Sequence, residues 1–171
     1  METETVDASR AIRVAHALNR LIGILHAARC TISIWLHRNG PPAAKNYSVQ
    51  MTYETAFLAL RKFQDLWLNH LTELLHEDSP ARLDGGRIIS ECEERGLRRA
   101  ANLIAAHYAN EKSEWPLTNK EIYDIIRNTG LTREEVFVKW LDPIGEKMIT
   151  IRNEIMQRYN IASLNEAIVE D

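Results

Sequence analysis

The stretch QMTYETAFLALRKFQDLWLNHLTELLH, residues 50–76, decides the fold. Its apolar side chains recur three and four residues apart, which is the spacing of one face of an α-helix. These apolar positions are Phe57, Leu58, Leu60, Phe63, Leu66, Trp67, Leu71, Leu74 and Leu75. Together with the apolar stripes of the other predicted helices, this stripe exceeds what one pair of helices can bury, so the sequence predicts a bundle of several helices.

Helical spacing continues on both sides of this stretch. The Gly-Pro-Pro of residues 40–42 ends the preceding helix, because proline cannot continue it. Further along, Gly96 is expected to end a short helix in a left-handed conformation. The expected helices span residues 6–38, 50–76, 87–94, 97–109 and 132–160.

Two capping patterns place helix starts in the second half of the chain. Thr118 followed by Glu121 forms a capping box, which opens a helix that closes at the Asn-Thr-Gly of residues 128–130. Thr132 and Glu135 repeat the same spacing and predict a second capping box at the start of the last helix.

Glycine and proline set the remaining breaks. Gly85 and Gly86 predict a turn, and Pro143 either kinks the last helix or opens a new one capped by Asp142. No segment alternates apolar and polar residues at the period of a β-strand. We therefore expect one all-α domain over residues 1–171, an up-and-down helical bundle of four main helices plus one or two short helices.

Composition and net charge limit the classes of protein to which the chain can belong. Hydrophobic residues make up 45% of the 171 residues and charged residues 26%, as in soluble globular proteins. The net charge is −3 and the pI about 6.1, whereas nucleic-acid binders usually carry a basic balance. Any contact with RNA must therefore rest on a local patch of positive charge.

Neither the N-terminal segment nor the most apolar run of the chain is typical of a membrane protein. The opening METETVDASR is polar and acidic, unlike a secretory signal peptide. The most apolar run, LIGILHAARCTISIWL at residues 21–36, is interrupted by His26 and Arg29. We expect no membrane contact and a cytoplasmic protein.

The sequence offers little for a metal or a cofactor. Cys30 and Cys92 lie far apart without metal-ligand spacing, and we expect both to be reduced and helical. Residues 73–76 form a single E-x-x-H, whereas carboxylate di-iron bundles need two such motifs on different helices. We expect no metal and no cofactor.

The stretch LRRAANLIAAHYANEK, residues 97–112, carries the functional signal. Its ANLIAAHY, residues 101–108, is followed by a short loop and PLTNKEIYDII, residues 116–126. Together these resemble the active-site region of HEPN-domain proteins, small helical bundles of toxin–antitoxin, abortive-infection and CRISPR-linked systems. The resemblance covers about residues 50–160, and residues 6–38 would supply the first bundle helix.

The HEPN motif is an arginine, then a polar residue that is often asparagine, then about four residues and a histidine. In this chain Asn102 takes the polar place and His107 the histidine place, while Ala101 stands where the motif has arginine. The resemblance implies that His107 is the general acid or base and that Asn102 positions a phosphate or the histidine ring. Arg98 and Arg99 would contact the phosphate.

Ala101 departs from the motif, since alanine carries no charge. Three explanations stay open: a deliberate replacement of the arginine in a toxic enzyme, a naturally degenerate domain, or a charge supplied by Arg98 or Arg99 one turn earlier. The first predicts that Ala101→Arg restores cleavage. Arg98 lies about 60° from position 101 around an ideal helix, so its long side chain is within reach.

The chemistry of such a site needs no metal. The 2′-hydroxyl of RNA is the nucleophile, a histidine moves the proton because it titrates near neutrality, and an arginine stabilises the charge on the phosphate. Positions 101 and 107 lie about 240° apart around a helix axis, so their side chains cannot share one narrow face of the helix. They would line a broad cleft between two copies of the helix, so we expect a homodimer.

The resemblance implies a metal-independent endoribonuclease, a toxin or an antiviral-defence effector, impaired by Ala101. Tyr108 is expected to stack on an RNA base or to pack. Many such toxins are neutralised by a nucleotidyltransferase antitoxin that modifies a tyrosine two residues after the histidine, whereas here Tyr108 is adjacent to His107. The alternative is a non-catalytic HEPN-like helical module that binds a protein partner, which the acidic pI and Ala101 favour.

Overall fold

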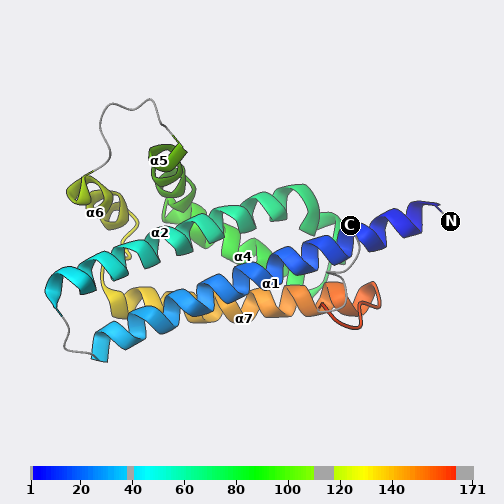
Figure 1. The fold of residues 1–171 in the computed structure, drawn as a ribbon. Coiled ribbons are helices and arrows are strands. Elements are labelled where there is room, and N and C mark those ends of the chain that lie inside the picture. Colours follow the sequence, from blue (N-terminus) through cyan, green and yellow to red (C-terminus); the bar gives the residue numbers. More distant parts are fainter. Residues whose placement is uncertain (1, 38–40, 110–117, 165–171) are drawn as a thin grey trace.

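The structure is a computed structural model that describes residues 2–37, 41–109 and 118–164, with side chains described except at 2–7, 106–109 and 119. Its helices are α1 (Glu2–His37), α2 (Pro42–Leu66), α3 (Thr72–Leu74), α4 (Pro80–Glu94), α5 (Leu97–Ala109), α6 (Asn119–Asn128) and α7 (Glu134–Arg158). A π-helical turn, η1 (Trp67–Leu71), joins α2 to α3. The described ranges contain no strand, which confirms the all-α prediction (Figure 1).

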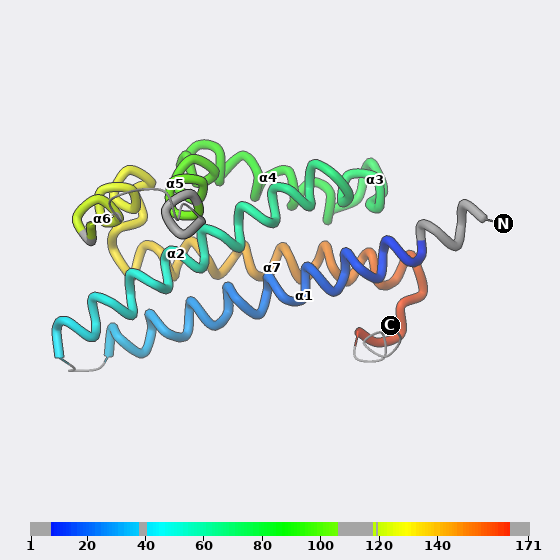
Figure 2. The backbone as a smooth tube through the Cα atoms, turned by 45° about the horizontal axis from the view of Figure 1, so that its top comes forward, coloured from blue at the N-terminus to red at the C-terminus, as the bar shows by residue number. Residues whose placement is uncertain are grey.

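Four helices run side by side along the length of the molecule. α1 packs most extensively against α7 and α2, and α4 packs against α7. α1 and α4 run in one direction while α2 and α7 run in the other (Figure 2). These four helices form the bundle in up-and-down order.

α5 confirms the helix predicted over residues 97–109, but it is not one of the four bundle helices. Its main neighbour is α2, with fewer contacts to α4 and α6. Figure 1 shows α5 and α6 on the side of α2 that faces away from α1. The fourth bundle helix is instead α4, which is longer than the segment predicted over residues 87–94.

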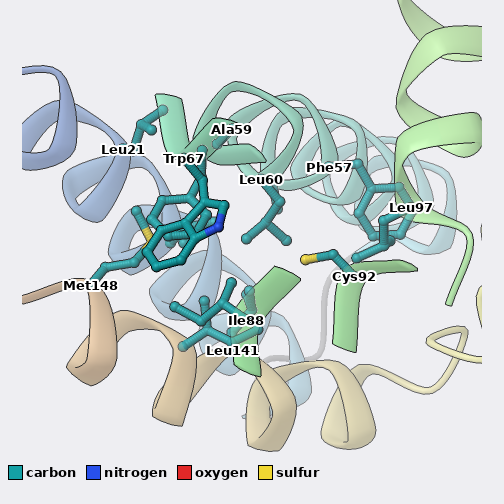
Figure 3. Close-up of a cluster of buried hydrophobic side chains, with 14 of the residues drawn as sticks. Leu21, Phe57, Ala59, Leu60, Trp67, Ile88, Cys92, Leu97, Leu141 and Met148 are labelled. Atoms are coloured by element: carbon teal, nitrogen blue, oxygen red, sulfur yellow. The ribbon is translucent and has the colours of Figure 1, made fainter. Parts of the chain in front are cut away.

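Trp67 explains why the prediction of a turn at Gly85 and Gly86 is wrong. Trp67 points from the end of α2 into the core (Figure 3), and its ring lies against α4 at Gly85. A Cβ at Gly85 would lie 1.8 Å from Cζ3 of Trp67, so only glycine fits there. The helix starts earlier, where the Ser79 hydroxyl accepts the backbone N–H of Arg82 at 3.1 Å.

One proline opens a helix earlier than predicted, and another lies inside a helix, which excludes one of its two predicted roles. α2 begins at Pro42, because a proline at the first helical position needs no hydrogen-bond partner for its nitrogen. The Gly-Pro-Pro segment thus separates α1 from α2 and also opens α2 eight residues before the predicted start at residue 50. Pro143 lies inside α7, so no new helix begins after Asp142.

One of the two predicted capping boxes is confirmed. The Thr118 N–H donates to Glu121 Oε2 at 2.7 Å, and the Glu121 N–H donates to Thr118 Oγ1 at 3.3 Å. The box predicted for Thr132 and Glu135 is wrong, because the N-cap of α7 is Arg133, one residue later, without a side-chain hydrogen bond.

A tight turn at Gly96 connects α4 to α5. Gly96 has φ +63°, the left-handed region that favours glycine, and its N–H donates to the carbonyl oxygen of Glu93 at 2.9 Å. This confirms the predicted helix end. Figure 1 shows that α5 leaves this turn in a direction different from that of α4.

Both cysteines are unpaired, as predicted. Cys30 is half-buried in α1 and Cys92 is buried in α4. Within the described ranges, no helix is long and apolar enough to cross a membrane.

Candidate nucleic-acid interface

α5 has one packed face and one solvent face. The packed face holds Leu97, Ala100, Ala101 and Ile104. The exposed face holds Arg98, Arg99, Asn102 and Leu103. Three of the residues that the sequence predicts for RNA contact, Arg98, Arg99 and Asn102, therefore share one surface.

Ala101 is not part of this surface. Its exposed fraction is 0%, because position 101 belongs to the face of α5 that packs against the bundle. Arginine at this position would place a guanidinium in the core, which is costly without a compensating partner. The structure thus separates Ala101 from Asn102, although the two are neighbours in the motif.

Arg98 links the exposed face of α5 to α2. Its Nη2 lies 3.6 Å from Oδ1 of Asp65, and both side chains are about half exposed. An ion pair with this exposure is weak and screened by salt, so Arg98 can exchange Asp65 for a phosphate at little cost.

The histidine and the tyrosine of the motif lie at the far end of α5. The helix continues to Ala109, so the backbone at His107 and Tyr108 is helical. Their side chains lie outside the described residues.

A groove between α1 and the end of α2 begins beside Asp65. It has a volume of about 600 Å³. Its polar lining consists of Arg20, Lys62, Asp65, Asn69 and His70. A smaller hollow of about 340 Å³ continues from it, shares Leu66 and His70, and adds Arg10 and Arg13. We call the two together the basic groove.

The π-helical turn η1 places His70 in the basic groove. One extra residue in this turn leaves Trp67 and Leu71 in the core, while His70 remains half-buried at the surface. Arg10 Nε donates to His70 Nδ1 at 3.2 Å, and Arg10 Nη2 donates to the carbonyl oxygen of Asn69 at 2.8 Å. Because Nδ1 accepts a hydrogen bond, the proton of a neutral His70 ring resides on Nε2.

The basic groove is locally positive although the chain as a whole is acidic. Among the side chains that the structure describes, its lining has four permanent cations and one carboxylate, Asp65, and a second carboxylate, Glu73, lies 2.6 Å from Arg10. These described side chains carry an excess of positive charge, whereas the whole chain has a net charge of −3. A local excess of positive charge can attract an anionic ligand even where the chain as a whole is acidic.

Sequence reasoning missed the basic groove, although part of its signal is local. Arg10, Arg13, Ala17 and Arg20 recur at intervals of three and four residues, which puts them along one face of α1. The contribution of Lys62 and His70 could not be read in this way, because they lie some fifty residues further along the chain.

A second arginine–asparagine pair lies on α7. Arg152 Nη2 donates to Asn153 Oδ1 at 2.9 Å, and Arg152 Nη1 donates to Asn19 Oδ1 of α1 at 2.7 Å. The order arginine then asparagine opens the HEPN motif, but residues 154–164 contain no histidine. This pair joins α7 to α1 and lacks an acid or base for catalysis.

The two ends of the E-x-x-H of residues 73–76 contact different partners. The Glu73 side chain pairs with Arg10, and the backbone N–H of His76 donates to Glu154 Oε1 at 3.4 Å. In the part of the chain that the structure describes, no group of three or more His, Cys, Asp or Glu side chains is placed to hold a metal ion.

No protein-family model, curated protein or solved structure matches this chain.

Proposed function

We propose that the chain is a HEPN-like, metal-independent endoribonuclease of weak activity, which acts as a toxin or defence effector on RNA. The observation that carries the proposal is the Arg98–Asp65 ion pair, which joins the exposed face of α5, with its two arginines, to the basic groove. A single RNA strand laid along this surface would meet cations on both sides of Asp65.

The roles follow from the chemistry of the exposed groups. Arg98 and Arg99 hold the scissile phosphate, and Asn102, one turn further along the same face, binds a phosphate oxygen or the ring of His107. His107 moves the proton of the 2′-hydroxyl or of the leaving oxygen. Tyr108 stacks on a base.

A second copy of the chain would complete the site. The exposed face of α5 carries Leu103, which is 46% exposed and lies beside Asn102. An apolar side chain among charged ones is a suitable contact for the same helix of a second copy. The homodimer that the sequence predicts would thus meet through α5 and bring two positive surfaces together.

The burial of Ala101 favours the alternative function, a non-catalytic module that binds a protein partner such as a nucleotidyltransferase-type antitoxin. Because position 101 is buried, the charge at the phosphate depends on Arg98 and Arg99 alone, without the third cation of the HEPN motif. Losing one such donor costs about 10²- to 10³-fold in rate in comparable sites.

The test measures binding and cleavage separately. Fluorescence anisotropy with a labelled single-stranded RNA pool reports binding, and gel analysis in EDTA reports cleavage and 2′,3′-cyclic phosphate ends. We expect binding and slow cleavage by the unchanged chain, loss of cleavage in His107→Ala, and weaker binding in the Arg98→Ala, Arg99→Ala double variant. Arg133→Ala is the matched control, because Arg133 is exposed and distant in sequence from both surfaces.

The outcomes separate the two functions. Binding that depends on Arg98 and Arg99 without any cleavage, in a folded dimer, would refute the catalytic function and leave a non-catalytic RNA-binding surface. Absence of both binding and cleavage for every RNA in the pool would refute the RNA-directed function altogether and favour the module that binds a protein partner. Toxicity on expression in bacterial cells, abolished by His107→Ala, would support the role as a toxin.

A further inference from the structure

A second cavity lies at the other end of α2, between that helix, α6 and the start of α7. It has a volume of about 530 Å³, within the usual range of small-molecule sites. Its walls include Tyr47, Gln50 and Tyr53 of α2, Tyr123 of α6 and Glu134 of α7. We call it the tyrosine pocket.

The buried hydroxyl of Tyr53 makes no hydrogen bond to the described residues. The side chain is 2% exposed, and its ring is held by Phe137 and Phe57 at centroid distances of 4.2 Å and 6.1 Å. Its Oη has no hydrogen-bond partner among the described residues. Phenylalanine would satisfy the same ring contacts without burying an unpaired polar atom, so the hydroxyl points to a partner from outside the chain.

The charge of the tyrosine pocket selects the kind of partner. Glu134 is the charged residue among the described side chains that line it, so the pocket attracts cations and repels anions. Burial, with Glu134 and Tyr123 adding to it, raises the pKa of Tyr53, so this hydroxyl stays protonated and neutral. The ammonium of Lys45 already lies 3.9 Å from Glu134, a long contact that another ammonium can replace.

The aromatic walls favour an organic cation over a metal ion. Tyr47 and Tyr123 are 65% and 56% exposed, so their ring faces are free to meet a ligand. A cation over such faces is attracted by the ring quadrupole, whereas Ca²⁺ or Mg²⁺ would require several oxygen ligands. The described lining residues include a single carboxylate, Glu134, and its one negative charge suits an ammonium group better than a divalent metal ion.

We propose that the tyrosine pocket binds a small organic ammonium ion with N–H groups, of the polyamine type. One N–H donates to Tyr53 Oη and another to the Glu134 carboxylate, while the Tyr47 and Tyr123 rings flank the charge. This site is separate from the RNA-directed surfaces and does not depend on the proposed nuclease function.

The test is calorimetric titration of the full chain with three probes. Putrescine has charge and N–H donors, tetramethylammonium has charge without donors, and the diol of the same chain length as putrescine has no charge. We expect putrescine to bind most tightly, tetramethylammonium more weakly and the diol not at all. No heat with putrescine at millimolar concentration, or equal binding of the diol, overturns the proposal.

Two variants test the assigned contacts. Glu134→Gln should weaken putrescine and tetramethylammonium by about tenfold or more, the size of one charge-assisted hydrogen bond or ion pair in a partly buried site. Glu135→Gln is the matched control, because Glu135 is the next residue and is 64% exposed. Equal affinity in Glu134→Gln and the control would remove Glu134 from the site.

Tyr53→Phe separates the hydrogen bond from the charge. It should weaken putrescine about tenfold and leave tetramethylammonium unchanged, because only putrescine donates to Oη. Without ligand, Tyr53→Phe should melt no lower than the unchanged chain, since the ring contacts remain and an unpaired hydroxyl is removed. A lower melting temperature would show that Oη has a structural partner and would refute its role as a ligand contact.

Discussion

Replacing Ala101 by arginine should destabilise the protein instead of restoring a phosphate contact. Ala101 is fully buried, so the added side chain overpacks the interface of α5, at about 1–3 kcal/mol. A guanidinium without a partner in the core adds about 3–5 kcal/mol, less if the long side chain bends toward water. We expect a total loss of at least about 3 kcal/mol, a large part of the 5–15 kcal/mol typical of a folded domain.

The matched control is Asn102→Arg. It introduces the same side chain at the next residue, which is exposed, so its effect on stability should stay within about 0.5 kcal/mol. Urea unfolding followed by circular dichroism measures both variants. In a chain of this size each kcal/mol lowers the melting temperature by about 2–4 °C, so Ala101→Arg should melt roughly 6–12 °C below the control.

The HEPN motif predicts the opposite result, since arginine at position 101 should restore RNA cleavage. The burial argument is refuted if Ala101→Arg is as stable as Asn102→Arg and cuts RNA to 2′,3′-cyclic phosphate ends in EDTA. Position 101 would then have to face a cleft, and α5 would have to turn about its axis when two chains associate. Loss of stability without gain of cleavage leaves Arg98 and Arg99 as the phosphate contacts.

Three further predictions concern the core and the basic groove. Gly85→Ala should lower stability by about 1–3 kcal/mol, because its Cβ would meet the ring of Trp67. Gly86→Ala should raise stability by about 0.5–1 kcal/mol, because open space surrounds this position in the helix. Urea unfolding compares the two variants. Burial raises the pKa of the Cys92 thiol from 9.0 to about 12. Between these pH values the thiol ionises in the unfolded chain but not in the folded one, so the free energy of unfolding should fall as pH rises. Urea midpoints measured across this range should depend less on pH in Cys92→Ala. The double variant Arg20→Ala, Lys62→Ala should weaken RNA binding and reduce the slope of log affinity against log salt by about 1.4, two single-strand phosphate contacts.

Local signals account for what the sequence predicted well. The helix over residues 97–109 and the capping box at Thr118 each depend on residues within one or two turns of each other. The left-handed turn at Gly96 is local in the same sense. The spacing of apolar residues, the capping pattern and glycine are sufficient to predict such elements, because these signals come from residues close together in the sequence.

Distant contacts account for what the sequence did not predict. Gly85 suggests a turn when only its neighbours are considered, but the ring of Trp67 from another helix requires a glycine inside α4. The pairing of Arg10 with His70 spans sixty positions of the chain and requires the π-helical turn. Neither arrangement has a counterpart in the local pattern, so each requires the packed structure.

Position 101 shows the limit of a motif as evidence. The motif treats Ala101 and Asn102 as neighbours in one site, because it records order along the chain. A helix turns by about 100° at each residue, so neighbours face different surroundings. Here the turn puts Ala101 in the core and Asn102 in solvent. Adjacent positions in a motif therefore do not ensure a shared surface. The packing of α5 on α2 decides which of them face solvent.

The net charge of the chain is an average over two surfaces of opposite sign. The basic groove collects arginines at one end of α2, and the tyrosine pocket presents Glu134 at the other end. Tyr47 and Lys62, one on each surface, are fifteen residues apart in the same helix, about 22 Å at 1.5 Å per residue. This separation exceeds the Debye length of about 8 Å at physiological salt, so each surface presents its own charge to its own ligand. An acidic pI therefore argues neither against RNA at the groove nor for it, and the local arrangement of charge has to decide.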